Sequence, residues 1–109
     1  MLTFITRGRY TQDAIEGMLA RPENRANAIE QLITRAGGKL VSYYMTNGEY
    51  DFLIIAEFEG FSFPSLIAAA AGGGVTNLMT EGALTAAEMP GAFEEAARIA
   101  ASFRPAGAG

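Results

Sequence analysis

Hydrophobic and polar residues alternate along this chain with two different periods, and the period changes several times. Residues 2–8, 39–46, 49–58 and 75–84 alternate with the period of two that is typical of a strand. Residues 22–36 instead carry apolar side chains three and four positions apart, which predicts a helix with one apolar face. The pattern therefore predicts four strands with helical segments between them.

Capping and breaking residues place the remaining helices. Thr11 is a suitable N-cap and Pro22 a helix breaker, so a short helix is predicted between them. Pro64 suits the first turn of a helix that ends at the glycines beginning with Gly72. Pro90-Gly91 interrupts the chain before a last amphipathic helix over 92–103. The order is βαββαβ plus a C-terminal helix, which predicts an α+β fold, a ferredoxin-like antiparallel sheet with helices on one face.

The segment between the second and third strands carries the clearest local signal. Asn47-Gly48 is the preferred pair for a two-residue hairpin turn, in which Gly48 takes a positive φ angle. Such a turn places Tyr44 opposite Asp51. One hairpin face is then almost wholly apolar and is predicted to pack against the helices, with the Tyr50 ring in the core. Its members are Val41, Tyr43, Met45, Tyr50, Phe52, Ile54, Ala56 and Phe58.

The opposite hairpin face also carries apolar side chains, which the helices of the same chain do not cover. They are Leu40, Tyr44, Leu53 and Ile55. This surface is large enough to favour a partner, and a second copy packed sheet against sheet is the simplest one. The sequence therefore predicts at least a homodimer, closed by this face.

The chain divides into three predicted parts. Residues 1–89 form the ferredoxin-like domain, and residues 90–103 form a helix that packs on this domain or on an oligomer neighbour. Residues 104–109 form a flexible tail rich in glycine and alanine.

Composition excludes several kinds of chemistry. The chain contains neither cysteine nor histidine, so disulfides, thiolate nucleophiles, zinc fingers and histidine-dependent triads are excluded. The net charge of −4 argues against nucleic-acid binding, which normally uses a basic face. We expect no metal and no cofactor. We also expect no membrane association and a cytoplasmic location, because no apolar run is long enough for a signal peptide or a membrane span.

Three short motifs resemble those of a known family. They are Gly37-Gly38-Lys39-Leu40, Ser42-Tyr43-Tyr44 and Gly48-Glu49-Tyr50-Asp51. In this combination, before an apolar strand, they resemble the GYD-domain family of small bacterial and archaeal proteins, which takes its name from residues matching Gly48, Tyr50 and Asp51. The resemblance extends from Leu2 to about Met89. It implies a fold similar to dimeric α/β-barrel domains, and it implies no particular chemistry.

The candidate ligand-binding residues are Tyr44, Asp51, Ser42 and Glu49, all on the mixed hairpin face. A tyrosine hydroxyl beside a carboxylate can orient a polar ligand or transfer a proton. The structural alternative is that Asp51 holds a loop or a backbone amide, and this alternative is favoured by about two to one, because structural networks also use such pairs. Gly48 and Tyr50 are predicted to be structural.

Three functions remain open. The first, which we favour, is a homo-oligomeric domain that binds a small molecule in a cleft at the sheet face or at the dimer interface. The second is a cofactor-independent, monooxygenase-like enzyme, suggested only by analogy of fold. The third is a structural assembly module without a ligand.

Overall fold

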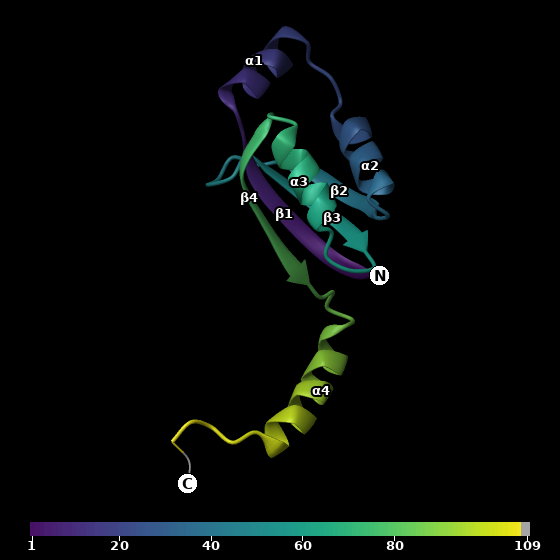
Figure 1. Ribbon diagram of the computed structural model, residues 1–109, viewed down its shortest axis with the longest axis vertical. Coiled ribbons are helices and arrows are strands. Elements are labelled where there is room, and N and C mark those ends of the chain that lie inside the picture. Colours follow the sequence, from purple (N-terminus) through teal and green to yellow (C-terminus); the bar gives the residue numbers. More distant parts are fainter. Residues whose placement is uncertain (108–109) are drawn as a thin grey trace.

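The computed structural model describes residues 1–107 of the 109-residue chain (Figure 1). Its elements in chain order are β1 (Leu2–Tyr10), α1 (Gln12–Ala20), α2 (Ala26–Arg35), β2 (Lys39–Met45), β3 (Phe52–Phe58), α3 (Phe63–Ala71), β4 (Val75–Ala83) and α4 (Met89–Ser102). The strands form one sheet in the order β2-β3-β1-β4, and each neighbouring pair is antiparallel. The predicted α+β, ferredoxin-like fold is therefore confirmed.

Local signals explain where the helices begin and end. The Thr11 hydroxyl accepts a hydrogen bond from the Ala14 amide at 3.1 Å, which caps α1. Ser62 caps α3 in the same way, by accepting from the Ser65 amide at 3.3 Å. Gly37 ends α2 with a φ of +88°, a conformation that glycine adopts without strain. Pro90 lies in the first turn of α4. The predicted interruption at Pro90-Gly91 is therefore wrong, because proline is tolerated where the helix has no amide partner to lose.

The compact core lies where α2 meets the sheet. Ile33, Ala56 and Phe58 are buried there. Partly buried side chains surround them, from Phe4, Ile29, Ala36, Leu40 and Ile54. Gly38 allows this packing, since a Cβ atom at that position would come within 2.4 Å of the Phe58 ring.

The β2–β3 hairpin differs from its predicted register. Met45 pairs with Phe52 and Tyr44 with Leu53, and the Thr46 amide donates to the Asp51 carbonyl at 2.8 Å. The loop is therefore longer than the two residues predicted, and Tyr44 does not lie opposite Asp51. Gly48 does not have a positive φ angle, so the turn geometry predicted for it is also wrong. The Thr46 hydroxyl stabilises this longer loop by donating to the Tyr50 carbonyl at 2.7 Å.

A bulge in β2 changes which side chains face the helices. The pairing shifts between Leu40 and Ser42, which leaves Val41 as the extra residue. Leu40 consequently packs against the core instead of on the open sheet face, and Val41 is exposed. Both residues were predicted on the wrong face, because period-two alternation does not persist through a bulge.

Helix α4 extends away from the rest of the chain (Figure 1). The described chain measures 64 × 28 × 24 Å and has a radius of gyration of 18.0 Å. A compact chain of about 100 residues has a radius of gyration of about 13 Å. Every residue of α4 is exposed. It is therefore not packed on its own domain, and packing on an oligomer neighbour stays a prediction. The predicted tail, 104–109, lies partly outside the described residues.

Candidate functional site

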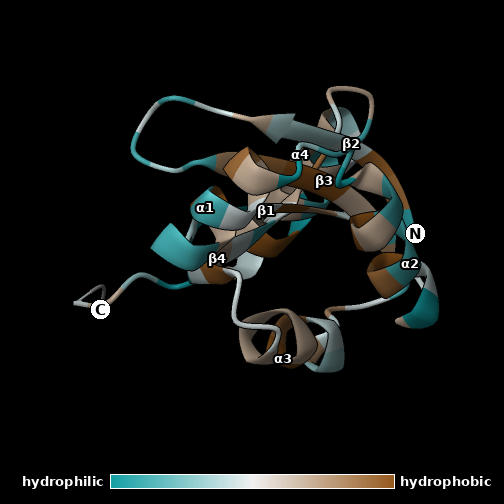
Figure 2. Ribbon diagram, turned by 90° about the horizontal axis from the view of Figure 1, so that it is seen from above, coloured by the Kyte–Doolittle hydropathy of each residue, from teal (hydrophilic) through white to brown (hydrophobic). Residues whose placement is uncertain are grey.

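A cavity of about 500 Å³ lies between the helices and the covered face of the sheet. Its floor comes from all four strands, with β2 contributing Tyr43, and its walls come from α1, α2, α3 and the segment that joins α1 to α2. Figure 2, viewed from above, shows α3 standing apart from the sheet. The lining is mainly apolar and aromatic, with contributions from Phe4, Met18, Ile29, Leu32, Phe52, Ile54, Phe61, Leu66, Val75 and Leu78. A cavity of this size is typical of a small-molecule site.

An irregularity in β4 helps to shape the cavity floor. Arg7 pairs with Met79 but Arg9 pairs with Thr76, so two residues of β4 face the single residue Gly8. Asn77 lies in this bulge with a φ of +53°. Val75 and Leu78 are three positions apart, so regular alternation would place them on opposite faces of the sheet. Because the bulge adds one residue, both side chains line the cavity.

Two tyrosines form a polar pair within the apolar lining. The hydroxyls of Tyr10 and Tyr43 lie 2.5 Å apart and share a hydrogen bond. Both rings pack against Phe52, with centroids 5.0 Å and 6.4 Å from its ring. Burial, and then the hydrogen bond shared with Tyr43, raises the pKa of Tyr10 well above its ordinary value of 10.0. Tyr10 therefore stays protonated at neutral pH.

Charged side chains stand beside the pair. Arg25 lines the cavity, and its positive charge partly opposes the rise in the Tyr10 pKa. The Arg25 guanidinium also pairs with Glu23 at 3.1 Å, an exposed interaction that contributes little to stability.

On the cavity floor, the Thr6 and Thr80 hydroxyls form a hydrogen bond with each other at 2.9 Å.

The tyrosine pair leaves hydrogen-bonding capacity for a ligand. Two hydroxyls carry two protons, and the bond between them uses one. The second proton is free to be donated, and lone pairs on both oxygens can accept. The pair can thus hold an oxygen atom of a ligand, and the nearby guanidinium favours an oxygen with negative partial charge.

The predicted ligand-binding residues lie elsewhere. The Asp51 carboxylate accepts from the Tyr10 backbone amide at 2.9 Å, and the Asp51 amide donates to the Gly8 carbonyl at 2.8 Å. This is the structural role that the sequence favoured for Asp51. Ser42 and Tyr44 lie on β2, where they pair with Ile55 and Leu53, and Tyr44 is 59% exposed. Glu49 is exposed in the hairpin loop. None of these four side chains lines the cavity.

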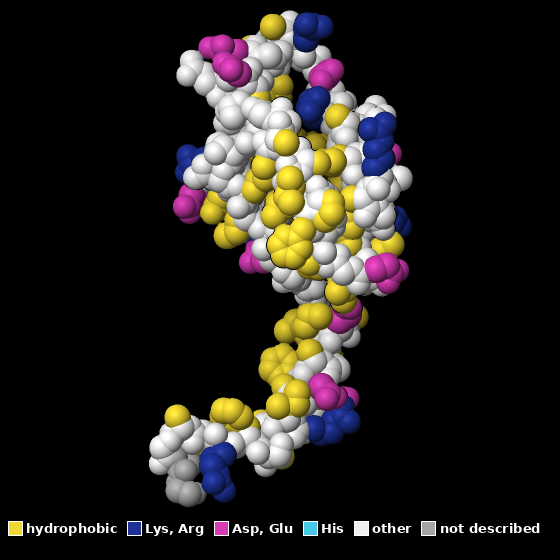
Figure 3. All heavy atoms as spheres, in the orientation of Figure 1, with side chains coloured by type: hydrophobic (Ala, Val, Ile, Leu, Met, Phe, Trp, Pro, Cys, Tyr) yellow, Lys and Arg dark blue, Asp and Glu magenta, His cyan; other side chains and the backbone are white. Residues whose placement is uncertain are grey.

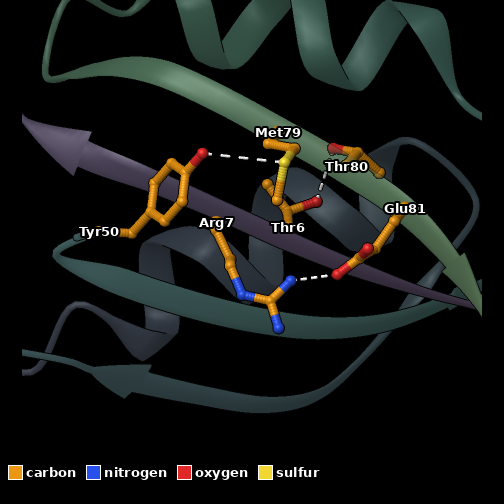
Figure 4. Close-up of polar contacts among 6 residues, drawn as sticks. All are labelled: Thr6, Arg7, Tyr50, Met79, Thr80 and Glu81. Atoms are coloured by element: carbon orange, nitrogen blue, oxygen red, sulfur yellow. Dashed lines mark hydrogen bonds and ion pairs between the residues drawn. The ribbon is translucent and has the colours of Figure 1, made fainter. Parts of the chain in front are cut away.

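Tyr50 does not enter the core. Its hydroxyl donates to the Met79 sulfur at 3.8 Å, on the sheet face away from the helices (Figure 4). Figure 4 also shows the Arg7 guanidinium paired with Glu81. The prediction of a buried Tyr50 ring is wrong, because the longer loop carries this residue past the end of the covered face. These charged side chains make the open face more polar than the hairpin alone suggested.

Tyr10 was not predicted as a site residue, and Tyr43 was predicted only to pack against the helices. The first strand was predicted to end at Gly8, whereas β1 continues to Tyr10. Extending the alternation of Phe4 and Thr6 by two further steps would have placed Tyr10 on the covered face.

Residues 1–107 lack two other kinds of site. In that part of the chain, no three acidic side chains lie close enough together to hold a metal ion. Across the same residues, no helix has the length and hydropathy needed to cross a membrane.

The chain is similar to a crystal structure of the protein TTHA0845 from Thermus thermophilus, with 19% identity and a TM-score of 0.44 over 79% of this chain and 96% of that one. No curated protein matches. The family model of the GYD domain matches residues 4–93, which include most of β1, the other three strands, the first three helices and the residues that line the cavity. This chain therefore belongs to the GYD-domain family.

Proposed function

We propose that this GYD-domain protein binds a mainly apolar small molecule in the cavity beneath α3, and that it works as a homo-oligomer. The observation that carries the binding proposal is the Tyr10–Tyr43 hydroxyl pair inside a mainly apolar lining. Such an arrangement, with few polar groups in a large apolar cavity, fixes the orientation of a ligand.

The chemistry of the pair defines the polar group of the ligand. Tyr10 is a proton donor at neutral pH, as an ordinary tyrosine is, and its raised pKa extends this state to more alkaline pH. A protonated tyrosine next to Arg25 favours an oxygen acceptor, such as a carbonyl, an enolate or a phenolate. The raised pKa opposes a role for Tyr10 as a general base. These properties favour binding over the monooxygenase-like alternative.

A matched pair of compounds tests this proposal. 1-Tetralone and tetralin share one apolar body, and only tetralone has a carbonyl. Each is titrated against the protein in the presence of 8-anilinonaphthalene-1-sulfonate, and displacement of this dye is followed by fluorescence. We expect tetralone to bind about tenfold more tightly than tetralin, since one net hydrogen bond is worth about 1.4 kcal/mol.

Two tyrosine variants identify the site. The double variant Tyr10→Phe with Tyr43→Phe keeps both rings against Phe52 but removes both hydroxyls, so it should abolish the preference for tetralone. Tyr44→Phe removes a neighbouring hydroxyl on the exposed strand face and should keep the preference. Equal loss in both variants, or no displacement by either compound, would refute binding at the tyrosine pair. Turnover of tetralone without added cofactor would instead support the enzymatic alternative.

A further inference from the structure

Helix α4 carries an apolar face that nothing in its own chain covers. Met89, Phe93, Ala96 and Ala100 follow one another at spacings of three and four, and Phe103 continues the row. Phe93 is 69% exposed and Phe103 is 70% exposed. The opposite side carries Glu94, Glu95, Arg98 and Ser102. An amphipathic helix of this kind is stable when its apolar face is buried against another element.

The orientation of α4 is set by an ordered connection. The Thr85 amide and hydroxyl both donate to a Glu88 carboxylate oxygen, at 2.9 Å and 3.0 Å. The Glu88 amide donates in return to the Thr85 hydroxyl at 3.3 Å, which completes a capping box. This turn lies between β4 and α4 and holds the helix away from the sheet.

A second uncovered apolar face lies on α3. The inner side of α3 lines the cavity through Ser65, Leu66 and Ala69. Its outer side carries Phe63 and Ile67, which are both 66% exposed. The helix contains no charged residue, and a helix that is apolar on all sides is normally buried.

Both faces open on the same side of the molecule. Figure 3 shows apolar side chains over α3 and, in the same view, along α4. A second copy turned by 180° about an axis between the two helices would bring each α4 over the other copy's α3. Such a twofold contact is satisfied equally in both copies.

We propose that two copies of this chain exchange their C-terminal helices, so that α4 of each packs on the outer face of α3 in the other. This inference specifies the partner surface of the self-association in the proposed function, and it does not depend on a ligand in the cavity. It also supplies an outer support for α3, which forms one wall of that cavity.

The buried area is sufficient for a stable dimer. A buried aromatic side chain contributes about 150–250 Å², so Phe93 and Phe103 together offer roughly 200–350 Å² at their observed exposure. With Met89 and Ile99 each arm buries about 400 Å², and two arms with two receiving faces reach about 1,600 Å², the size of a standard specific interface. A membrane surface is less well matched, because α4 offers two glutamates and only one arginine on its polar side.

A pair of charge substitutions tests the exchange by sedimentation at micromolar concentration. The native chain should sediment at twice its mass of 11.5 kDa. Phe93→Glu places a charge in the interface of both copies, and we expect it to weaken dimerisation by about thirtyfold or more. Ala101→Glu adds the same charge seven residues after Glu94, on the polar side, and should leave the dimer intact. A Phe93→Glu chain that remains fully dimeric would overturn the proposal and point to the open sheet face.

Crosslinking then tests which surfaces meet. The chain has no cysteine, so Ile67→Cys and Ile99→Cys each introduce one unique thiol. A mixture of the two variants, treated with a short bismaleimide, should give a crosslinked dimer that neither variant gives alone. Absence of this mixed product, or a monomeric native chain that binds vesicles of anionic lipid, would refute the exchange. Dye displacement by tetralone is measured separately, so failure of the binding proposal is distinguishable from failure of this one.

Discussion

Gly8 provides the sharpest stability prediction, because it sits where β1 passes beneath the Phe52 ring. A Cβ atom at Gly8 would lie 2.6 Å from the end of the Phe52 ring and 2.9 Å from a methyl group of Leu78. Phe52 is only 3% exposed, so its ring has little room to move away. Gly8→Ala should therefore destabilise the fold, although the same substitution at an open position is neutral or slightly stabilising.

The magnitude follows from the overlap. Inserting a methyl group into a packed region costs about 1–3 kcal/mol, and the loss of chain entropy in the unfolded state offsets about 0.4–1 kcal/mol of this. We expect a net loss of about 1–2 kcal/mol in the free energy of unfolding, or a fall of roughly 5–15 °C in Tm. Because the chain has no tryptophan, unfolding in urea is best followed by circular dichroism.

Gly82→Ala is the matched control. Gly82 pairs with Phe4 in the same sheet, and a Cβ atom there would meet nothing within 4 Å. The double variant Gly8→Ala with Phe52→Leu completes a double-mutant cycle. The shorter leucine side chain should relieve part of the clash, so the double variant should lose less stability than the sum of the two single losses. If Gly8→Ala is as stable as Gly82→Ala, the argument from close approach is wrong.

Three further predictions concern local hydrogen bonds. Thr11→Ala removes the acceptor at the start of α1 and should cost about 0.5–2 kcal/mol in chemical denaturation, whereas an unchanged midpoint would contradict the capping role. Asp51→Ala leaves the Tyr10 amide without its acceptor and should cost about 1–3 kcal/mol, while Asp51→Asn keeps one acceptor oxygen and should cost less. Equal losses of stability in these two variants would show that the hydrogen bond from the Tyr10 amide to Asp51 contributes nothing. Hydrogen bonds from Thr85 hold the pKa of Glu88 below its ordinary value of 4.5, so the capping box should be fully formed above pH 4.5 and lost as the pH falls through the lowered pKa. The protection factor of the Glu88 amide, which donates to the Thr85 hydroxyl, should therefore fall only in acid, and an unprotected Glu88 amide at neutral pH would refute the assignment.

The sequence by itself determined the order of the elements and the fold class. Burial of one face imposes a period of two on strands and about 3.6 on helices, and both periods are local in the chain. Caps such as Thr11 act within one turn and were therefore predictable. The family was predictable for the same reason, because its motifs lie within the short segment from Gly37 to Asp51.

Tertiary structure decided the register, the bulges and the site. The hairpin loop extends past Asn47-Gly48 because Asp51 is held at the end of β1, by bonds to Gly8 and Tyr10 that are about forty positions away in the chain. The bulge at Val41 moves Leu40 into the core, and the bulge at Asn77 turns Val75 toward the cavity. Tyr10 and Tyr43 meet only because β1 and β2 lie on either side of β3. Interactions between residues so distant in sequence leave no local pattern, and they determine the shape and polarity of the cavity.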